Sequence, residues 1–177
     1  MRYDVLEKNV IDVMQEFQTK IGYSRTDMGL FYPLESLNRL LGTDHDKAEM
    51  LRELKRFSVA SMETLCGTDA SCDGEMFRIN IPKEGVEQVH ETVPVPPFLV
   101  DFLKKMGSDP KNIDDIASVF KKYAKDVVIK PIKGDDFDWL IYFPGGEPDE
   151  YRYCIKFEEG HATYHRFTEK DYEAFGF

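Results

Sequence analysis

The chain has 177 residues, of which 42% are hydrophobic and 32% are charged, and its formal net charge at pH 7 is −10. This length and composition suit one large domain or two small domains with a hydrophobic core, and they exclude wholesale disorder. No apolar run approaches the roughly 20 residues that a transmembrane helix needs, and the N-terminus shows no apolar signal core. Three cysteines are too few for a disulfide framework, so the sequence predicts a cytoplasmic protein without a membrane span.

The first elements along the chain are predicted to be helices with one short strand between them. Apolar residues recur at helical spacing from Leu6 to Ile21, and Gly22 suits the end of this helix. A short strand over residues 28–32 precedes a second helix that starts at Pro33, and a third helix covers residues 46–58. The core predicted for these helices consists of Leu6, Val13, Phe17, Leu37, Leu41, Leu51, Leu54 and Phe57.

Two further strands and a short helix complete this half of the chain. The apolar residues predict strands over residues 59–65 and 76–81, and the polar, glycine-bounded residues 66–74 predict a long loop between them. Pro82 then opens a short helix.

This order of elements resembles the winged-helix variant of the helix-turn-helix fold. Residues 34–42, LESLNRLLG, are followed by a tight turn and another helix, and residues 77–86, FRINIPKEGV, are similar to the last strand and following helix of many winged-helix regulators. The resemblance covers residues 4–91. Residues 22–37 also resemble an uncharacterised family of proteins from Gram-positive gut bacteria, and that resemblance implies no activity.

A proline-rich segment divides the chain. The prolines within residues 93–97 exclude a helix and predict a stiff, extended linker between a domain at residues 1–92 and a domain at residues 98–177. Residues 1–92 contain 11 basic and 17 acidic side chains, a net charge of −6, and residues 93–177 contain 12 and 16, a net charge of −4. Neither half has the positive charge expected of a protein that coats nucleic acid.

The residues after the linker predict an α+β domain. Helical apolar spacing covers residues 98–106, Asp109 and Pro110 suit the start of a second helix, and Thr168 begins a motif that resembles a capping box. The four strands predicted between the second and the terminal helix cover residues 127–132, 139–143, 151–157 and 162–167. The whole chain is therefore predicted to be α+β, with a winged-helix-like N-terminal domain followed by two helices, a four-stranded antiparallel sheet and a C-terminal helix.

Candidate nucleic-acid contacts gather on the predicted third helix, which the winged-helix resemblance places in the major groove of DNA. At helical spacing, three basic side chains project together, away from the buried stripe. Two further cations lie on the second helix and beside the predicted wing. The five candidates are Arg39, Arg52, Lys55, Arg56 and Arg78.

Acidic residues near these cations favour a different partner. Glu49–Arg52 and Glu53–Arg56 are expected to form ion pairs three residues apart on a solvated helix face. The predicted wing loop contains Asp69 and Asp73 but no Lys or Arg, whereas a wing that contacts DNA normally places cations against the phosphates. A protein or a small ligand is therefore favoured over DNA as the partner.

The cysteines and histidines offer little for metal or redox chemistry. Cys66 and Cys72 lie at the two ends of the predicted wing loop, where they are expected to be buried or half-buried, with a labile disulfide as the alternative. Two thiolates do not complete a zinc site. His161 and His165 lie on one predicted strand, about 13 Å apart, which is too far to share an ion. We therefore expect no metal and no cofactor.

One cysteine–histidine pair does suggest a candidate nucleophile. A two-residue turn at Glu159-Gly160 places Cys154 opposite His165 on neighbouring strands. A thiol beside an imidazole is the starting point of a thiolate–imidazolium nucleophile. However, no orienting carboxylate and no oxyanion-hole motif accompanies the pair, so catalysis is the least favoured hypothesis.

Together these patterns favour a cytoplasmic, non-enzymatic protein that binds another protein or a small ligand through its winged-helix-like module. The alternative is a DNA-binding transcriptional regulator whose C-terminal domain senses a signal or dimerises. The third hypothesis is a cysteine-dependent enzyme that uses Cys154 and His165.

Overall fold

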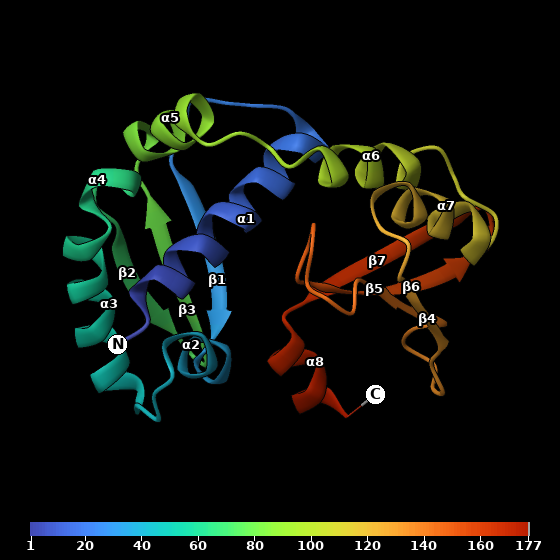
Figure 1. Ribbon diagram of the computed structural model, residues 1–177. Coiled ribbons are helices and arrows are strands. Elements are labelled where there is room, and N and C mark those ends of the chain that lie inside the picture. The colour runs from blue at the N-terminus through green and yellow to red at the C-terminus, as the bar shows by residue number, and fades with distance from the viewer. Residues whose placement is uncertain (177) are drawn as a thin grey trace. The chain divides into compact units, whose positions relative to one another are not determined.

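The structure is a computed structural model and describes residues 1–176. It contains two compact units that divide between Val95 and Pro96, within the proline-rich segment (Figure 1). The described residues form eight helices and two antiparallel sheets, one of three strands and one of four. This arrangement confirms the α+β class.

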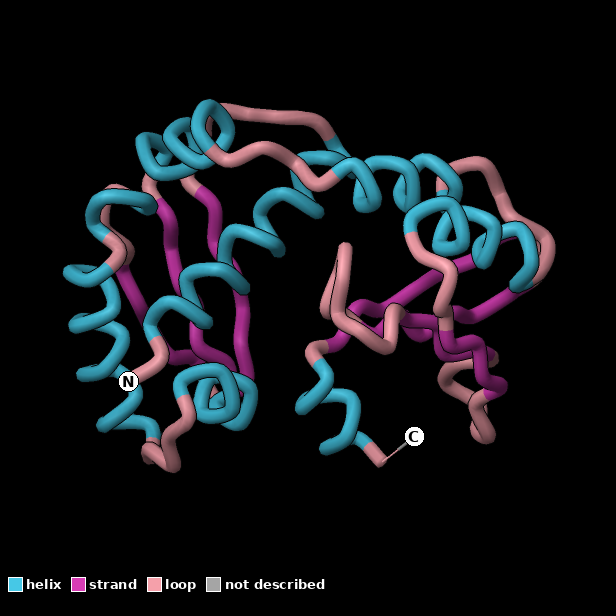
Figure 2. The backbone as a smooth tube through the Cα atoms, in the orientation of Figure 1, coloured by secondary structure: helices cyan, strands magenta, loops and turns pink. Residues whose placement is uncertain are grey.

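The N-terminal unit consists of helices and a three-stranded sheet. The elements are α1 (Tyr3–Ile21), β1 (Met28–Pro33), α2 (Leu34–Leu41), α3 (Lys47–Ala60), α4 (Met62–Leu65), β2 (Asp69–Asp73), β3 (Met76–Ile81) and α5 (Lys83–Thr92). The strands pair in the order β1-β3-β2, so β3 is the central strand. Helix α1 contacts β1 and α3 contacts β2, and Figure 2 shows these helices in cyan beside the three magenta strands.

Local residue choice explains where these helices begin and end. Pro33 is extended and stands at the N-cap of α2, and Gly42 ends that helix in the left-handed region at a φ of 70°. Helix α3 starts with a capping box in which Asp46 accepts a hydrogen bond from the backbone of Glu49 and Glu49 accepts one from the backbone of Asp46.

The prediction of a strand over residues 59–65 is wrong. Helix α3 continues to Ala60, and α4 occupies most of the remainder. Val59 is 73% exposed whereas Ser61 and Leu65 are buried, and this is burial on a helical period and not an alternating one. The second strand of the hairpin is instead β2, inside the segment predicted to be a loop, and it joins β3 through a two-residue turn at Gly74 and Glu75.

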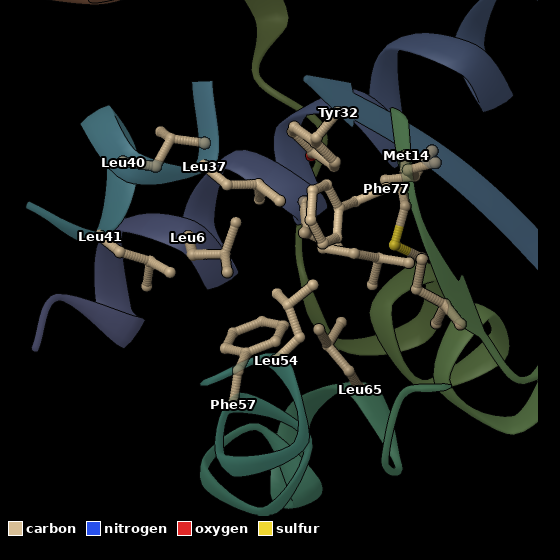
Figure 3. Close-up of a cluster of buried hydrophobic side chains, with 14 of the residues drawn as sticks. Leu6, Met14, Tyr32, Leu37, Leu40, Leu41, Leu54, Phe57, Leu65 and Phe77 are labelled. Atoms are coloured by element: carbon tan, nitrogen blue, oxygen red, sulfur yellow. The ribbon is translucent and has the colours of Figure 1, made fainter. Parts of the chain in front are cut away.

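Most of the predicted core of this unit is confirmed. Figure 3 shows Leu6 of α1, Leu41 of α2 and Phe57 of α3 gathered in one cluster. The five predicted core residues that are at most 1% exposed are Leu6, Leu37, Leu41, Leu54 and Phe57. Val13 and Leu51 are partly buried against the same cluster.

The prediction that Phe17 belongs to this core is wrong. Its side chain is 48% exposed, and that of Ile21, four residues later on the same stripe, is 66% exposed. The apolar stripe of α1 therefore continues for more than a turn beyond the residues that bury it.

The C-terminal unit pairs two helices with a four-stranded meander. Its elements are α6 (Pro97–Met106), α7 (Ile113–Tyr123), β4 (Val128–Pro131), β5 (Trp139–Tyr142), β6 (Arg152–Glu158), β7 (His161–Phe167) and α8 (Glu169–Phe175). The strand order is β4-β5-β6-β7. One face of this sheet packs Tyr153 and Ile155 against the aromatic rings of α6 and α7, and the other packs Cys154 and Phe167 near Tyr172.

Of the two helix starts predicted in this unit, that of α8 is confirmed and that of α7 is shifted. Thr168 accepts a hydrogen bond from the backbone of Asp171 and begins α8, as predicted. Helix α7 begins later than predicted, because Asn112 caps it by accepting a hydrogen bond from the backbone of Asp115. Asp109 precedes the helix with a left-handed φ of 53°.

Candidate functional site

Helix α3 presents the three basic side chains that the sequence singled out. Arg52, Lys55 and Arg56 are all exposed. Within residues 1–176, Arg52 and Lys55 form no ion pair or hydrogen bond through their side chains. The guanidinium of Arg56 differs, because its Nη1 lies 2.9 Å from Oε2 of Glu53. The predicted Glu53–Arg56 pair is thus confirmed.

Glu53 is the unexpected member of this group. Its side chain is buried, with a residue exposure of 2%, although the sequence analysis placed it on a solvated strip. The carboxylate accepts hydrogen bonds from the Tyr3 hydroxyl and from Arg56, and Nε2 of His45 lies 3.7 Å away. Glu53 lies three residues after Met50 and four before Phe57, so helical spacing alone could have placed it on the buried face.

The environment of Glu53 keeps its carboxylate ionised. Burial by itself opposes ionisation, but the hydrogen bonds from Tyr3 and Arg56 and the nearby positive charge hold the pKa of Glu53 below its usual value. Burial and the hydrogen bond to Glu53 raise the pKa of Tyr3 to about 12. The cluster therefore fixes Arg56 to the body of the unit as one half of an ion pair.

The predicted Glu49–Arg52 pair does not form. The Glu49 carboxylate is used in the capping box, where its Oε2 accepts a hydrogen bond of 3.0 Å from the backbone of Asp46. That oxygen also lies 3.9 Å from Nδ1 of His45. The capping box therefore occupies the carboxylate that was expected to pair with Arg52.

The other two nucleic-acid candidates lie on α2 and β3 and not on α3. Arg39 lies on α2 with its Nη1 3.9 Å from Oε2 of Glu35. Arg78 lies on β3 between Phe77 and Ile79, which are fully buried against the helices, so Arg78 projects from the opposite face of the sheet. The predicted set is therefore split between helix and sheet.

The hairpin in the position of the wing is acidic. Asp69 and Asp73 of β2 are exposed, and neither β2 nor the turn at residues 74–75 contains Lys or Arg. Nζ of Lys47, at the start of α3, lies 2.5 Å from Oε1 of Glu75 in the turn. This ion pair joins the hairpin to α3 and uses a cation that would otherwise face solvent.

The face of the three-stranded sheet opposite the helices is a surface that the sequence analysis missed. We call it the outer sheet face. It consists of Gly29, Phe31 and Pro33 of β1, Met76, Arg78 and Asn80 of β3, and Asp69, Ser71 and Asp73 of β2. The alternation of apolar and polar residues in FRINI, residues 77–81, was a signal that could have indicated it.

Apolar and cationic side chains lie on β1 and β3 of the outer sheet face. Phe31 is 64% exposed and Met76 is 39% exposed. The guanidinium carbon of Arg78, directly opposite Phe31 in the pairing, lies 5.9 Å from the centre of the phenyl ring. A Cβ atom at Gly29 would lie only 2.5 Å from Nε of Arg78, so glycine there lets the Arg78 side chain lie flat along β1.

The candidate nucleophile Cys154 is paired with His165 as predicted, but its surroundings do not activate the thiol. Cys154 and His165 are directly opposite each other in β6 and β7. Cys154 is fully buried, and burial raises the pKa of its thiol to about 12. An activated cysteine needs the opposite shift. The His165 ring lies 4.1 Å from that of Phe167, so the imidazole packs on an aromatic surface.

The other two cysteines, Cys66 and Cys72, differ in how far they are exposed. The burial expected for Cys66 is wrong, because this residue ends α4 in the left-handed region and is exposed, whereas Cys72 lies half-buried on β2 as expected; both are free thiols. Among residues 1–176, no group of three or more His, Cys, Asp and Glu side chains has an arrangement that could hold a metal ion.

These features define an α+β protein of two units that exposes a sheet face with an arginine on its central strand and an aromatic side chain on the neighbouring edge strand. Residues 3–176 match the family model described as "Domain of unknown function, E. rectale Gene description (DUF3877)", and the chain belongs to that family. No curated protein and no solved structure matches the chain. None of the helices in residues 1–176 combines the length and the apolar character of a membrane span.

Proposed function

We propose that this protein is a non-enzymatic binding protein and that its N-terminal unit is a winged-helix-like module that docks a protein partner through the outer sheet face. The order α1-β1-α2-α3-α4-β2-β3 and the pairing β1-β3-β2 support the winged-helix comparison. The fold alone does not choose between DNA and protein as the partner, so the choice depends on the surfaces.

The exposed Phe31 beside Arg78 is the observation that supports docking. Aromatic and arginine side chains are the types that dominate the binding energy of protein interfaces. Here the guanidinium lies against the phenyl ring, and Met76 extends the apolar surface on the central strand. A large aromatic side chain left 64% exposed on the edge strand β1 gains free energy when a partner covers it.

The charges around Arg78 specify the chemistry of the partner. Arg78 is the central cation, and Asp69 and Asp73 lie on the β2 side of the face. We expect a partner segment that offers one carboxylate to Arg78, an apolar side chain beside Phe31, and neutral or basic residues toward β2. The three free cysteines support placing this interaction in the reducing cytoplasm.

Photo-cross-linking tests this proposal. We would replace Phe31 with p-benzoylphenylalanine and express the full chain in the bacterium that produces it. We expect an adduct whose cross-linked peptide contains Asp or Glu, and we expect Arg78→Glu to abolish it. The same photoreactive residue at Val59, which is 73% exposed on α3, is the matched control. No adduct at position 31, or equal adducts at both positions that Arg78→Glu leaves unchanged, would contradict the proposal.

DNA binding by α3 is the second candidate function. The observation that favours it is that Arg52 and Lys55 are exposed and have no acidic partner among the described residues. The ion pair of Arg56 with Glu53 and the acidic hairpin weigh against it, because phosphate neutralisation supplies much of the affinity for DNA.

A further inference from the structure

A pocket of about 330 Å³ lies between the last turns of α1, the loop at residues 22–27 and strand β1. All of its lining residues belong to the N-terminal unit, and they include Phe17, Gln18 and Ile21 of α1 and Met28 and Leu30 of β1. Its volume is at the lower end of the range for small-molecule sites. The pocket lies outside the residues through which we propose protein docking, apart from Gly29 at its margin.

Gln18 gives this pocket an unused hydrogen-bond donor. The residue is only 9% exposed, and its buried carboxamide nitrogen has no hydrogen-bond partner. Gln15, one turn earlier on α1, shows the usual arrangement, since its Nε2 donates to the carbonyl oxygens of Val93 and Pro94 at 3.0 and 3.2 Å. A buried donor without an acceptor is costly, so an acceptor supplied by a ligand in the pocket would remove that cost.

The walls beside Gln18 are apolar and only partly covered. Phe17 and Ile21 continue the apolar stripe of α1 but are 48% and 66% exposed. Met28 and Leu30 of β1 line the same pocket. Ser24, Thr26 and Asp27 complete the lining, so the pocket combines apolar walls with a few polar groups, which is the usual composition of a small-molecule site.

The loop at residues 22–27 is anchored to α5, and Figure 1 shows it passing beside that helix. The Tyr23 ring stacks on His90 with the ring centres 3.8 Å apart, and Arg25 forms an ion pair of 2.8 Å with Glu87. Oδ1 of Asp27 accepts a hydrogen bond of 2.9 Å from the backbone of Lys83. These contacts restrain the loop that forms one wall of the pocket, and a restrained wall lowers the ordering cost of binding.

We propose that this pocket binds a small, uncharged organic molecule with an apolar body and a carbonyl oxygen that accepts a hydrogen bond from the Gln18 amide. The apolar body lies against Phe17, Ile21 and Met28. Asp27 is the one charged residue among those that line the pocket, so an anionic ligand is disfavoured there.

Titration of the ¹⁵N-labelled full chain with hexanamide, followed by NMR, tests the proposal. Hexanamide combines a short apolar chain with a neutral carbonyl group. We expect saturable shifts of the Gln18 side-chain amide and of the backbone amides of Gly22 and Leu30, with a dissociation constant in the millimolar range. Hexanoate, which has the same chain with a carboxylate, is expected to bind several-fold more weakly.

Two variants connect the shifts to the pocket. Gln18→Met keeps the length of the side chain but removes the donor, and we expect it to weaken hexanamide binding by roughly three- to tenfold. Gln88→Met on α5 is the matched control and should bind as the wild type does. Since Gln18→Met removes an unpaired buried donor, its melting temperature should be at least that of the wild type. The absence of saturable shifts at Gln18, or equal affinity in Gln18→Met and wild type, would overturn the proposal.

Discussion

At the scale of single residues, Glu53 shows how one buried carboxylate decides what a neighbouring cation can do. Its hydrogen bonds with Tyr3 and Arg56 join the start of α1 to the middle of α3. The same bonds remove Arg56 from the set of cations that are free to meet a phosphate. Arg52 and Lys55, on the same helix, have no such restraint.

The depressed pKa of Glu53 predicts a pH-dependent contribution to stability. A carboxyl whose pKa is lower in the folded than in the unfolded chain stabilises the fold above its ordinary pKa, here 4.5, and this contribution is lost as the pH falls through the folded value. We expect Glu53→Gln to lower the free energy of unfolding at pH 7 by about 2 kcal/mol. The deficit should shrink below pH 4.5, as the wild-type carboxyl becomes protonated.

Urea denaturation of both proteins at pH 7 and pH 3.5 measures this difference, because the other carboxylates contribute equally to each. Glu63→Gln, an exposed position on α4, is the control and should stay within about 0.5 kcal/mol of the wild type at both values. A deficit for Glu53→Gln that is the same at pH 7 and pH 3.5 would show that Glu53 stabilises the fold without its charge.

At the scale of elements, the sequence predicts a feature well when a few neighbouring residues determine it, as in the pairing register of a hairpin. The two-residue turn at Glu159-Gly160 predicted the register of β6 and β7, including the Cys154–His165 and Ile155–Tyr164 pairs, and all of it is confirmed. A turn of fixed length leaves only one register, so no long-range information is needed.

Residues 59–65 and the candidate site show where local signals are insufficient. The apolar residues in VASMETL suit a strand as well as a helix, and packing decides between them, with Leu65 buried next to α5. The outer sheet face and the pocket beside Gln18 combine residues from separate strands and helices. Their composition therefore depends on pairings such as Phe31–Arg78 that hydrophobic spacing does not encode.

The contact between α4 and α5 allows a test of this packing. Gly85 is buried near the start of α5, and a Cβ atom there would lie 2.1 Å from the backbone oxygen of Leu65. Alanine normally favours a helix over glycine by about 1 kcal/mol, but here the clash is with backbone, which cannot rotate away. We expect Gly85→Ala to reduce the free energy of unfolding by about 2 kcal/mol.

Gly107→Ala is the matched control, because a Cβ atom at Gly107 would meet its nearest neighbour at 3.5 Å and its φ of −70° suits alanine. That variant should be neutral or slightly stabilising by thermal and urea denaturation. Equal stability of Gly85→Ala and wild type would mean that α4 and α5 can separate at little cost.

At the scale of the whole molecule, charge sets the balance between the two candidate functions. The chain has a net charge of −10, and residues 1–92 have −6, from 11 basic and 17 acidic side chains. Such a charge opposes approach to a polyanion unless a local cationic surface is strong enough to overcome it. On α3 that surface is reduced to Arg52 and Lys55 once Arg56 is paired with Glu53.

We therefore expect no micromolar or tighter binding to random duplex DNA at physiological salt, and only weak binding at low salt. The variant that tests α3 is Arg52→Glu with Lys55→Glu, because changing Arg56 as well would leave the buried Glu53 without its ion-pair partner and would destabilise the fold. Fluorescence anisotropy at two salt concentrations measures the affinity and its salt dependence. If α3 contacts phosphates, the double variant should flatten the dependence of log K on log salt by about two, one for each lost contact. Micromolar binding at physiological salt that the double variant abolishes would make α3 a DNA-binding helix. Weak binding that is equal in wild type and variant would exclude α3 as a surface that contacts DNA.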